Sequence, residues 1–324
     1  MRAVTRLLLV TLAALPFAAS AVTWNMATPY PEATFHTQND EQFAKDIEQA
    51  TDGSLTINIH PAGSLIKHPQ IKRAVQTGQV QAGEVFISIL GNENPVFSVD
   101  SVPFLATSYD QARALWNASR PKIESLLAED GIKLLYAVPW PPQGLYVSKP
   151  IDSVDDLKGL KFRAYNSETS TLAKLTGMVP TQVEVPEIPQ AFSTGIVEAM
   201  ITSPSTGANS NAWDFVNRFY DIQAWIPKNM IMVNQRAFDS LSKDQQKAVM
   251  DAAKAAEKRG WKMSREESSS KKQVLEKHGM KVLQPSEKLM SGLRDIGTKM
   301  TKQWLEDAGE DGQAIIDNYR KATD

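Results

Sequence analysis

Strand-like and helix-like segments alternate along almost the whole chain, and this alternation limits the fold more than any other feature. Residues 54–60 (SLTINIH) alternate strictly between polar and apolar side chains, which is typical of a half-buried strand. A helical pattern follows over residues 71–77, stops at Gly78 and leads into an apolar segment at residues 82–89. Repetition of this order predicts an α/β fold with a mainly parallel, doubly wound sheet.

The first 21 residues have the features of a secretory signal peptide. Arg2 and Arg6 give a positive start, and the apolar run at residues 7–17 is too short to span a bilayer. Residues 19–21 (ASA) fit the small-x-small rule for cleavage. We predict that the mature chain begins after Ala21. A buried N-terminal helix is the alternative interpretation.

The composition limits both the cellular compartment in which the protein is expected and the classes of partner that it is expected to bind. The chain has 324 residues and no cysteine, and a chain of this length can bury enough core for two domains without disulfides. Export without cysteine suits the bacterial periplasm, and it excludes thiolate zinc sites and cysteine nucleophiles. A formal net charge of −2 implies no polybasic face, so nucleic acid is not an expected partner.

Signatures of catalysis are missing from the sequence. It contains no Gly-rich nucleotide loop, no zinc-protease motif and no nucleophile elbow. The four histidines, His36, His60, His68 and His278, lack metal-ligand spacing, and we interpret each as a surface or half-buried residue. We therefore expect no catalytic residue, no metal and no cofactor.

Two features predict a division into two lobes. The Pro-rich turn at residues 139–144 (PWPPQG) follows a strand and is a candidate crossing between domains. Ser242 to Gln245 form a capping box for a helix extending to about His278, roughly 50 Å at about 1.5 Å per residue, which is long enough to reach across both lobes. With a second crossing near residues 229–235, the predicted lobes are residues 22–143 plus about 235–280, and residues 144–234 plus about 281–324.

Arg163 is the main candidate for a binding residue. In LKFRAY, residues 160–165, alternation places Phe162 on one face of a strand and Arg163 with Tyr165 on the other. Ligands of open α/β sheets collect outside the carboxyl ends of the strands. A guanidinium group there matches a carboxylate in a two-pronged geometry that lysine cannot copy. The strand pattern alone leaves open a second interpretation, in which Arg163 is solvated or paired within the protein.

Other polar and aromatic residues lie where they can complete a pocket with a few convergent polar groups. They occupy the crossing turn, the end of the strand with Arg163, the end of a later strand, and an aromatic segment near residues 213–225. The candidates are Trp140, Gln143, Tyr165, Asn166, Thr202, Ser203 and Trp213.

Several segments of the chain, in order, resemble the solute-binding proteins of tripartite ATP-independent periplasmic (TRAP) transporters. Residues 61–83 are similar to that family's first-lobe segment, and residues 241–253 are similar to the start of its long bridging helix. Residues 154–167 resemble the segment with its signature arginine, which maps onto Arg163. Residues 187–200 resemble a further motif but depart from it at Pro189, Phe192, Glu198 and Ala199.

This resemblance implies a two-lobed periplasmic binding protein fold with a ligand cleft between the lobes and a long helix bridging both. Arg163 would bind the carboxylate of a small organic acid, and the loaded protein would deliver it to membrane subunits driven by an ion gradient. Residues 162–180 and 140–146 look most like a branch associated with aromatic acids such as hydroxybenzoates.

We therefore predict a periplasmic carboxylate-binding protein, monomeric or dimeric, that carries out no bond chemistry. Ligand binding would favour the closed state over the open one, and a transporter would respond to that closure. Two other functions remain open at this point. One is an exported sensing subunit that feeds a receptor, and the other is an exported hydrolase on a doubly wound sheet.

Overall fold

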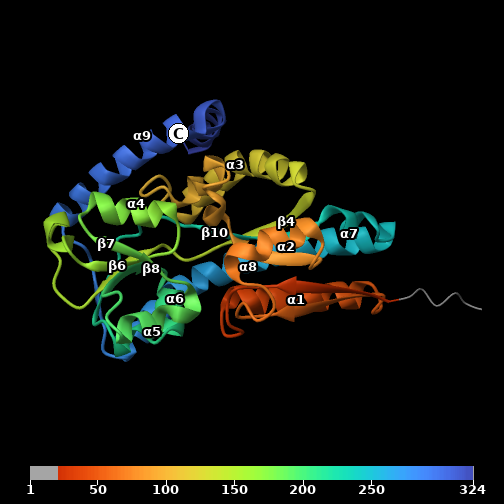
Figure 1. The fold of residues 1–324 in the computed structure, drawn as a ribbon, viewed down its shortest axis with the longest axis horizontal. Helices are drawn as coiled ribbons and strands as arrows, with labels where there is room; N and C mark the ends of the chain where they lie inside the picture. Colours follow the sequence, from red (N-terminus) through yellow and green to blue (C-terminus); the bar gives the residue numbers. More distant parts are fainter. Residues whose placement is uncertain (1–20, 324) are drawn as a thin grey trace, which may run out of the picture.

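The computed structural model describes residues 21–323, which form two lobes, each built on its own β-sheet (Figure 1). This is the two-lobed α/β architecture expected from the sequence. The predicted signal peptide lies outside the described residues, apart from Ala21. We call the part built on the first sheet the first lobe, and the part built on the second sheet the second lobe.

The first sheet has five strands within the described residues. In pairing order they are β2 (Leu55–His60), β1 (Val22–Ala27), β3 (Ala82–Phe86), β10 (Lys228–Asn234) and β4 (Ile132–Pro139). The strictly alternating segment predicted as a strand is β2, which pairs in parallel with β1. Trp24, Phe43 and Tyr136 are almost completely buried and belong to the core around this sheet.

The second sheet has six strands within the described residues. In pairing order they are β11 (Lys281–Leu283), β9 (Arg218–Tyr220), β5 (Gly144–Val147), β8 (Ala199–Thr202), β6 (Lys161–Ala164) and β7 (Val179–Gln182). Strand β6, next to the edge strand β7, runs parallel to both β7 and β8. Phe162 on this strand is completely buried.

Each sheet contains one antiparallel strand, in a partial departure from the mainly parallel arrangement expected. β10 is antiparallel to β3 and β4, and β5 is antiparallel to β8 and β9. Both strands enter directly from the other lobe. A strand that arrives from the cleft runs away from it, whereas the parallel strands run toward it.

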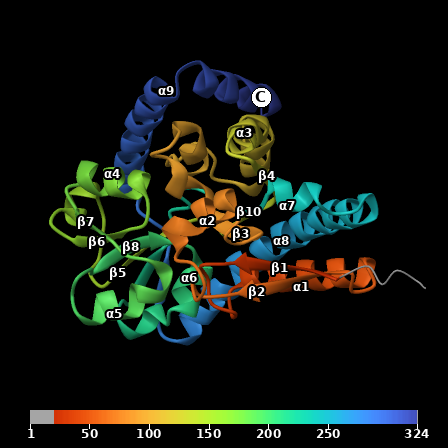
Figure 2. The ribbon, with the colours of Figure 1, turned by 45° about the vertical axis from the view of Figure 1, so that its right-hand side comes forward.

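Helices cover the faces of both sheets (Figures 1 and 2). Those of the first lobe are α1 (Phe35–Ala50), α2 (Ile71–Thr77), α3 (Tyr109–Glu129) and α7 (Gln235–Asp239). Those of the second lobe are α4 (Ser167–Leu175), α5 (Ile188–Ser193) and α6 (Pro204–Asn209). The 3₁₀ segments are η1 (His68–Gln70), η2 (Ile87–Leu90), η3 (Pro95–Ser101), η4 (Val154–Leu157), η5 (Val185–Glu187) and η6 (Ala212–Asp214).

Two extended crossings connect the lobes side by side. The first is the predicted Pro-rich turn between β4 and β5, and the second joins β9 to β10. The crossings are hydrogen-bonded to each other: Gln143 N–H donates to the Trp225 carbonyl at 3.0 Å, and Ala224 N–H donates to the Gln143 carbonyl at 2.9 Å. Because β10 pairs in the first sheet, the second crossing precedes Lys228, and the lobe boundary predicted at residue 234 falls at the wrong end of this strand.

Helix α8 (Lys243–Lys277) is the long bridging helix that the sequence predicted. Its capping box forms between Ser242 and Gln245, and the residue after its last turn is His278. The helix packs against α1 and β4 in the first lobe and against α6 and β11 in the second. Across residues 21–323, no helix combines the length and apolarity needed to pass through a bilayer.

Helix α9 (Glu287–Thr323) also bridges the lobes, and this corrects the prediction that the chain after residue 281 stays in the second lobe. The helix breaks at Gly309, whose φ of 56° and ψ of −136° are not helical. Around and beyond this break it packs on the first lobe, where Trp304 Nε1 donates to the Pro95 carbonyl at 2.7 Å and Tyr319 Oη to the Leu105 carbonyl at 2.9 Å. Figure 1 shows it passing over the molecule from the second lobe toward α3.

Candidate ligand-binding site

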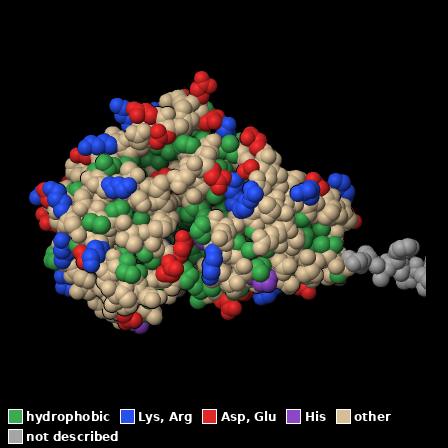
Figure 3. Space-filling model, viewed as in Figure 1, with side chains coloured by type: hydrophobic (Ala, Val, Ile, Leu, Met, Phe, Trp, Pro, Cys, Tyr) green, Lys and Arg blue, Asp and Glu red, His purple; other side chains and the backbone are tan. Residues whose placement is uncertain are grey.

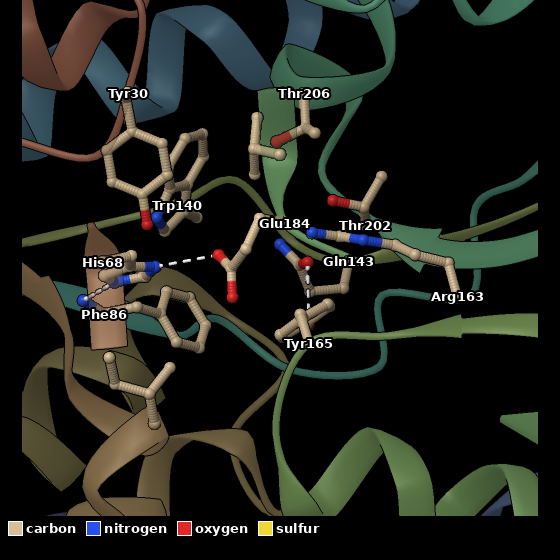
Figure 4. A pocket seen from close by; sticks show the side chains of 12 residues that line it. Tyr30, His68, Phe86, Trp140, Gln143, Arg163, Tyr165, Glu184, Thr202 and Thr206 are labelled. Atoms are coloured by element: carbon tan, nitrogen blue, oxygen red, sulfur yellow. Dashed lines mark hydrogen bonds and ion pairs between the residues drawn. The ribbon is translucent and has the colours of Figure 1, made fainter. Parts of the chain in front are cut away.

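Arg163 lies on β6, between β8 and β7 in the second sheet, where alternation separates it from buried Phe162. Its side chain is only 2% exposed. The Nε–H group donates to the Val183 carbonyl at 3.0 Å, and the guanidinium carbon lies 4.7 Å from the ring centre of Tyr165. The strand and these two contacts hold the guanidinium group at the cleft between the lobes, where Figure 4 shows it directed into a cavity.

The guanidinium group is not directly paired with a carboxylate of the described residues. Within residues 21–323, no Asp or Glu side chain forms an ion pair with Arg163. Burial lowers the pKa of Arg163, while Tyr165 and Glu184 oppose that shift. An arginine remains protonated under these conditions. A buried cation without a direct ion pair is unfavourable, so the site is suited to an anion supplied from outside.

The cavity in front of Arg163 is formed by both lobes and by the crossings (Figure 4). About 390 Å³ is left unfilled by atoms, including the open mouth. Seen from the side of Figure 3, the surface is hollowed along the line between the lobes, and hydrophobic side chains are visible there. The lining residues are Tyr30, His68, Phe86, Ile89, Trp140, Gln143, Arg163, Tyr165, Glu184, Val185, Thr202 and Thr206.

One wall of the cavity is aromatic, and its polar atoms are already occupied. Tyr30 Oη and Trp140 Nε1 both donate to Asn229 Oδ1, at 3.2 Å and 2.9 Å. Asn229 is anchored in turn, because its Nδ2 donates to Glu84 Oε1 at 2.6 Å. The Tyr30 and Trp140 rings meet edge to face, with centres 5.1 Å apart. This wall therefore offers ring surface to a ligand rather than hydrogen-bond donors.

A hydrogen bond across the cleft joins the lobes at the cavity. His68 Nδ1 of the first lobe lies 3.1 Å from Glu184 Oε2 of the second. Burial alone raises the pKa of Glu184, but its hydrogen bond and electrostatic interaction with His68, and then the charge of Arg163, outweigh burial and hold that pKa below its usual value. Glu184 is therefore an ionised carboxylate in the same pocket as the Arg163 guanidinium group.

Five of the predicted site residues line the cavity: Arg163, Trp140, Gln143, Tyr165 and Thr202. Trp140 and Gln143 do so from the first crossing, while Thr202 does so from the carboxyl end of β8. Gln143 also accepts a hydrogen bond from Tyr165 Oη at 3.3 Å. The candidates at the strand ends and in the crossing turn are thus brought together in space.

Three predicted residues lie outside the cavity lining. Ser203 caps α6 by accepting the Thr206 N–H at 3.0 Å. Asn166 caps α4 and donates from Nδ2 to Ser88 Oγ of the first lobe at 2.7 Å, so it contributes to closure instead. Trp213 stacks on His278 with ring centres 3.8 Å apart, at the end of α8.

The cavity also contains residues that sequence reasoning missed, and His68 is the clearest case. Together with His36 it is buried, which corrects the expectation that every histidine is surface or half-buried. His68 comes from η1 and Glu184 from the loop after β7, so neither carries a periodic signal. Among the described residues, no group of three or more His, Asp or Glu side chains is arranged to hold a metal.

Comparison with known proteins places the chain among solute receptors. Residues 26–307 match the family model for bacterial extracellular solute-binding proteins, family 7. The solved structure of DctP7, an extracytoplasmic solute receptor of Bordetella pertussis that binds pyroglutamic acid, is 47% identical with a TM-score of 0.91, covering 93% of this chain and 100% of that one. A TRAP solute-binding protein from a marine metagenome, specific for pyroglutamate, is 41% identical with a TM-score of 0.91, covering 93% and 99%. Among proteins compared by sequence, a solute-binding protein of Albidiferax ferrireducens is 26% identical, covering 83% of this chain and 80% of that protein.

The two lobes are joined by paired crossings and enclose a shared cavity, and a buried cation lines that cavity. This arrangement defines a receptor that holds a small acid between its lobes. The chain belongs to the bacterial extracellular solute-binding proteins of family 7, and it is a TRAP solute-binding protein, as its motifs predicted. Proteins of this family are receptors rather than enzymes, so the chemistry of the site is binding and release.

Proposed function

We propose that the protein captures pyroglutamate in the periplasm and delivers it to the membrane subunits of a TRAP transporter. The observation that carries the proposal is Arg163, a buried guanidinium group that faces the cavity and forms no direct ion pair with a carboxylate of the described residues. Two relatives that are 47% and 41% identical over nearly their full lengths bind pyroglutamate, and this supports the choice among small acids.

The rest of the cavity suits a small ring with one carboxylate. Arg163 supplies the charge, and its planar donors match a carboxylate in a bidentate pair. Tyr30, Trp140, Phe86 and Tyr165 supply ring surfaces around it. Specific pockets commonly combine apolar walls with a few convergent polar groups. An aromatic acid such as a hydroxybenzoate, the ligand predicted from the sequence, has a ring and a carboxylate too, so it is the competitor to test.

Isothermal titration calorimetry on protein freed of bound ligand by unfolding and refolding tests the proposal. We expect pyroglutamate to bind, and hydroxybenzoate and glucuronate to bind at least an order of magnitude more weakly. At about 100 times its dissociation constant, the preferred acid should add ~2.7 kcal/mol of stability in a thermal-shift assay. Tighter binding of hydroxybenzoate would establish the aromatic acid as the ligand, and binding of none of the three would exclude this ligand class.

Variants of Arg163 test its role directly. Removing one partner of a buried charge pair typically costs ~2–5 kcal/mol, so Arg163→Ala should lose about two orders of magnitude or more in affinity. Arg163→Lys should also bind weakly, because an ammonium group cannot form the bidentate pair. Lys161→Ala is a matched control, because Lys161 lies on the same strand but is exposed. Near wild-type affinity in both Arg163 variants would contradict the assignment.

Delivery to a transporter needs a separate experiment, because a sensing subunit would bind the same acid. Radiolabelled pyroglutamate uptake should fall in cells that lack either this protein or the membrane subunits encoded with it. Uptake that persists without the protein, together with loss of a transcriptional response to pyroglutamate, would favour sensing.

A further inference from the structure

Glu184 is an unexpected neighbour for an anion-binding arginine. It is half-buried in the cavity wall, and a second negative charge there opposes the binding of a carboxylate. In Figure 4 one of its oxygens faces His68, and the other points away from His68 into the cavity. An ionised carboxylate can only accept hydrogen bonds. The oxygen that does not face His68 therefore favours a ligand that offers a donor.

His68 fixes which Glu184 oxygen remains free. The backbone N–H of Phe86 donates to His68 Nε2 at 3.2 Å, so Nε2 is the acceptor. In a neutral imidazole the proton then resides on Nδ1, which donates to Glu184 Oε2 at 3.1 Å. The backbone of β3 cannot reverse its N–H group, so the histidine cannot exchange its two roles. The arrangement is a relay from Phe86 through His68 to Glu184.

We propose that this relay makes the pocket select a carboxylic acid whose ring carries an N–H donor, with Glu184 accepting that hydrogen bond and His68 acting as a positioning residue. The inference rests on the proposed function and deepens it. A lactam acid such as pyroglutamate has its ring N–H close to the carboxylate held by Arg163. A benzoate or a lactone acid has no such donor.

The relay also ties this selection to closure. His68 and Phe86 belong to the first lobe and Glu184 to the second, so Glu184 is aligned only when the lobes meet. An acid without the donor leaves this Glu184 oxygen facing the ligand without a hydrogen bond to it in the closed state. We therefore expect such an acid to bind more weakly, because it does not stabilise the closed contact between the two lobes.

The sharpest test compares two acids that differ in one ring atom: pyroglutamate and its lactone analogue, in which oxygen replaces the N–H. A site built for a hydrogen bond rejects a ligand that lacks it, so wild-type protein should prefer pyroglutamate by roughly 100-fold or more. In Glu184→Gln, the amide oxygen should accept the hydrogen bond from His68 Nδ1–H, as the carboxylate oxygen does in the wild type. The amide NH₂ group then faces the ligand and offers a donor instead of an acceptor, so the preference should reverse toward the lactone.

Two further variants separate positioning from contact. His68→Phe removes the relay but keeps a ring, so it should lower the preference for pyroglutamate at least about tenfold while Glu184 is still present. Glu198→Gln, an exposed carboxylate before β8, should change nothing. The readout is the ratio of the two dissociation constants, because a loss of stability alone would weaken both acids together.

The outcomes distinguish the two proposals. If pyroglutamate binds through Arg163 but Glu184→Gln keeps the wild-type ratio, the relay is refuted and the proposed function stands. If wild-type protein binds both acids equally, the donor requirement is refuted. If it binds neither, the proposed ligand and this inference both fail.

Discussion

At the scale of single residues, the first lobe hides an acid pair directly behind the aromatic wall. Asp40 and Glu84 are fully buried. Burial raises the pKa of Glu84, and its two accepted hydrogen bonds, from Thr28 and Asn229, oppose that rise. Among the described residues, Asp40 accepts only one, from Tyr136 Oη at 2.8 Å. Burial first, and then the neighbouring Glu84, raise the pKa of Asp40 well above its usual value. We therefore expect Asp40 to keep its proton at neutral pH.

This arrangement predicts how stability depends on pH. The unfolded chain loses the Asp40 proton near pH 3.8, while the folded protein holds it to much higher pH. The folded state binds more protons in that window, so the contribution of Asp40 to stability falls as pH rises from about 3.8 upward. Asp40→Asn mimics the protonated form and should flatten this dependence, with stability at neutral pH equal to or above that of the wild type.

Thermal unfolding of Asp40→Asn and the wild type across acidic to neutral pH measures the difference. Glu48→Gln on the exposed face of the same helix is the control, and its pH profile should follow the wild type. An Asp40→Asn variant that keeps the wild-type slope, or that is much less stable at neutral pH, would show that Asp40 is ionised when folded.

At the scale of elements, helix α8 packs closely against the first sheet at Gly260. A methyl group there would lie 2.5 Å from Val138 Cγ2 and 2.8 Å from Cγ1. Valine is stiff, and Val138 is completely buried on β4, so it cannot easily yield. Gly260→Ala should therefore be destabilising by about 1–3 kcal/mol from overpacking, more than the ~1 kcal/mol that alanine gains in a helix.

Chemical denaturation of Gly260→Ala checks this prediction. Ser269→Ala on the exposed face of the same helix controls for helix propensity and should be neutral or slightly stabilising. Equal stabilisation in both variants would mean that the helix does not need close contact with β4.

The sequence predicted elements well where a local signal marks them. The capping boxes at Ser108 and Ser242 mark the starts of α3 and α8, and Gly78 ends α2 in a left-handed conformation. The sequence analysis missed the return of α9 to the first lobe. This return depends on the break at Gly309 and on the position at which strand β11 places the start of the helix. A helical pattern gives the length of an element but not the surface it meets.

The same limit applies to the site. Arg163 was found because a strand alternates and its neighbours follow a motif, whereas Trp213 was chosen for its chemistry alone and lies against His278. His68 and Glu184 are far apart in the chain and meet only because the lobes meet. Contacts made by closure leave no periodic trace in one sequence, so the His68–Glu184 pair escaped prediction.

At the scale of the whole molecule, the structure has the lobes in contact across the cleft. Glu184 meets His68 and Asn166 meets Ser88, one lobe contributing each partner. Without a ligand the buried charge of Arg163 opposes this closed state, so we expect the free protein to open about the two hydrogen-bonded crossings.

Spin labels can measure this motion directly, because the chain contains no cysteine. We would label Gln70→Cys and Gln190→Cys, exposed positions on the first and second lobes, and measure the label separation by pulsed electron resonance. The separation should be longer without ligand and shorten with pyroglutamate. The same pair in Arg163→Ala should stay long. Identical distances with and without ligand in the otherwise wild-type protein would exclude closure driven by the ligand.

The position of β10 has a consequence for how the chain is made. This strand lies between β3 and β4, yet it follows five strands of the second sheet in the sequence. The first lobe is therefore the first to be started during synthesis but is completed late. The edges of β3 and β4 that pair with β10 stay open until residue 234 is available. Open strand edges are sites of aggregation. The nascent protein is thus most vulnerable midway through its synthesis, and a chaperone that covers those two edges would protect it during that interval.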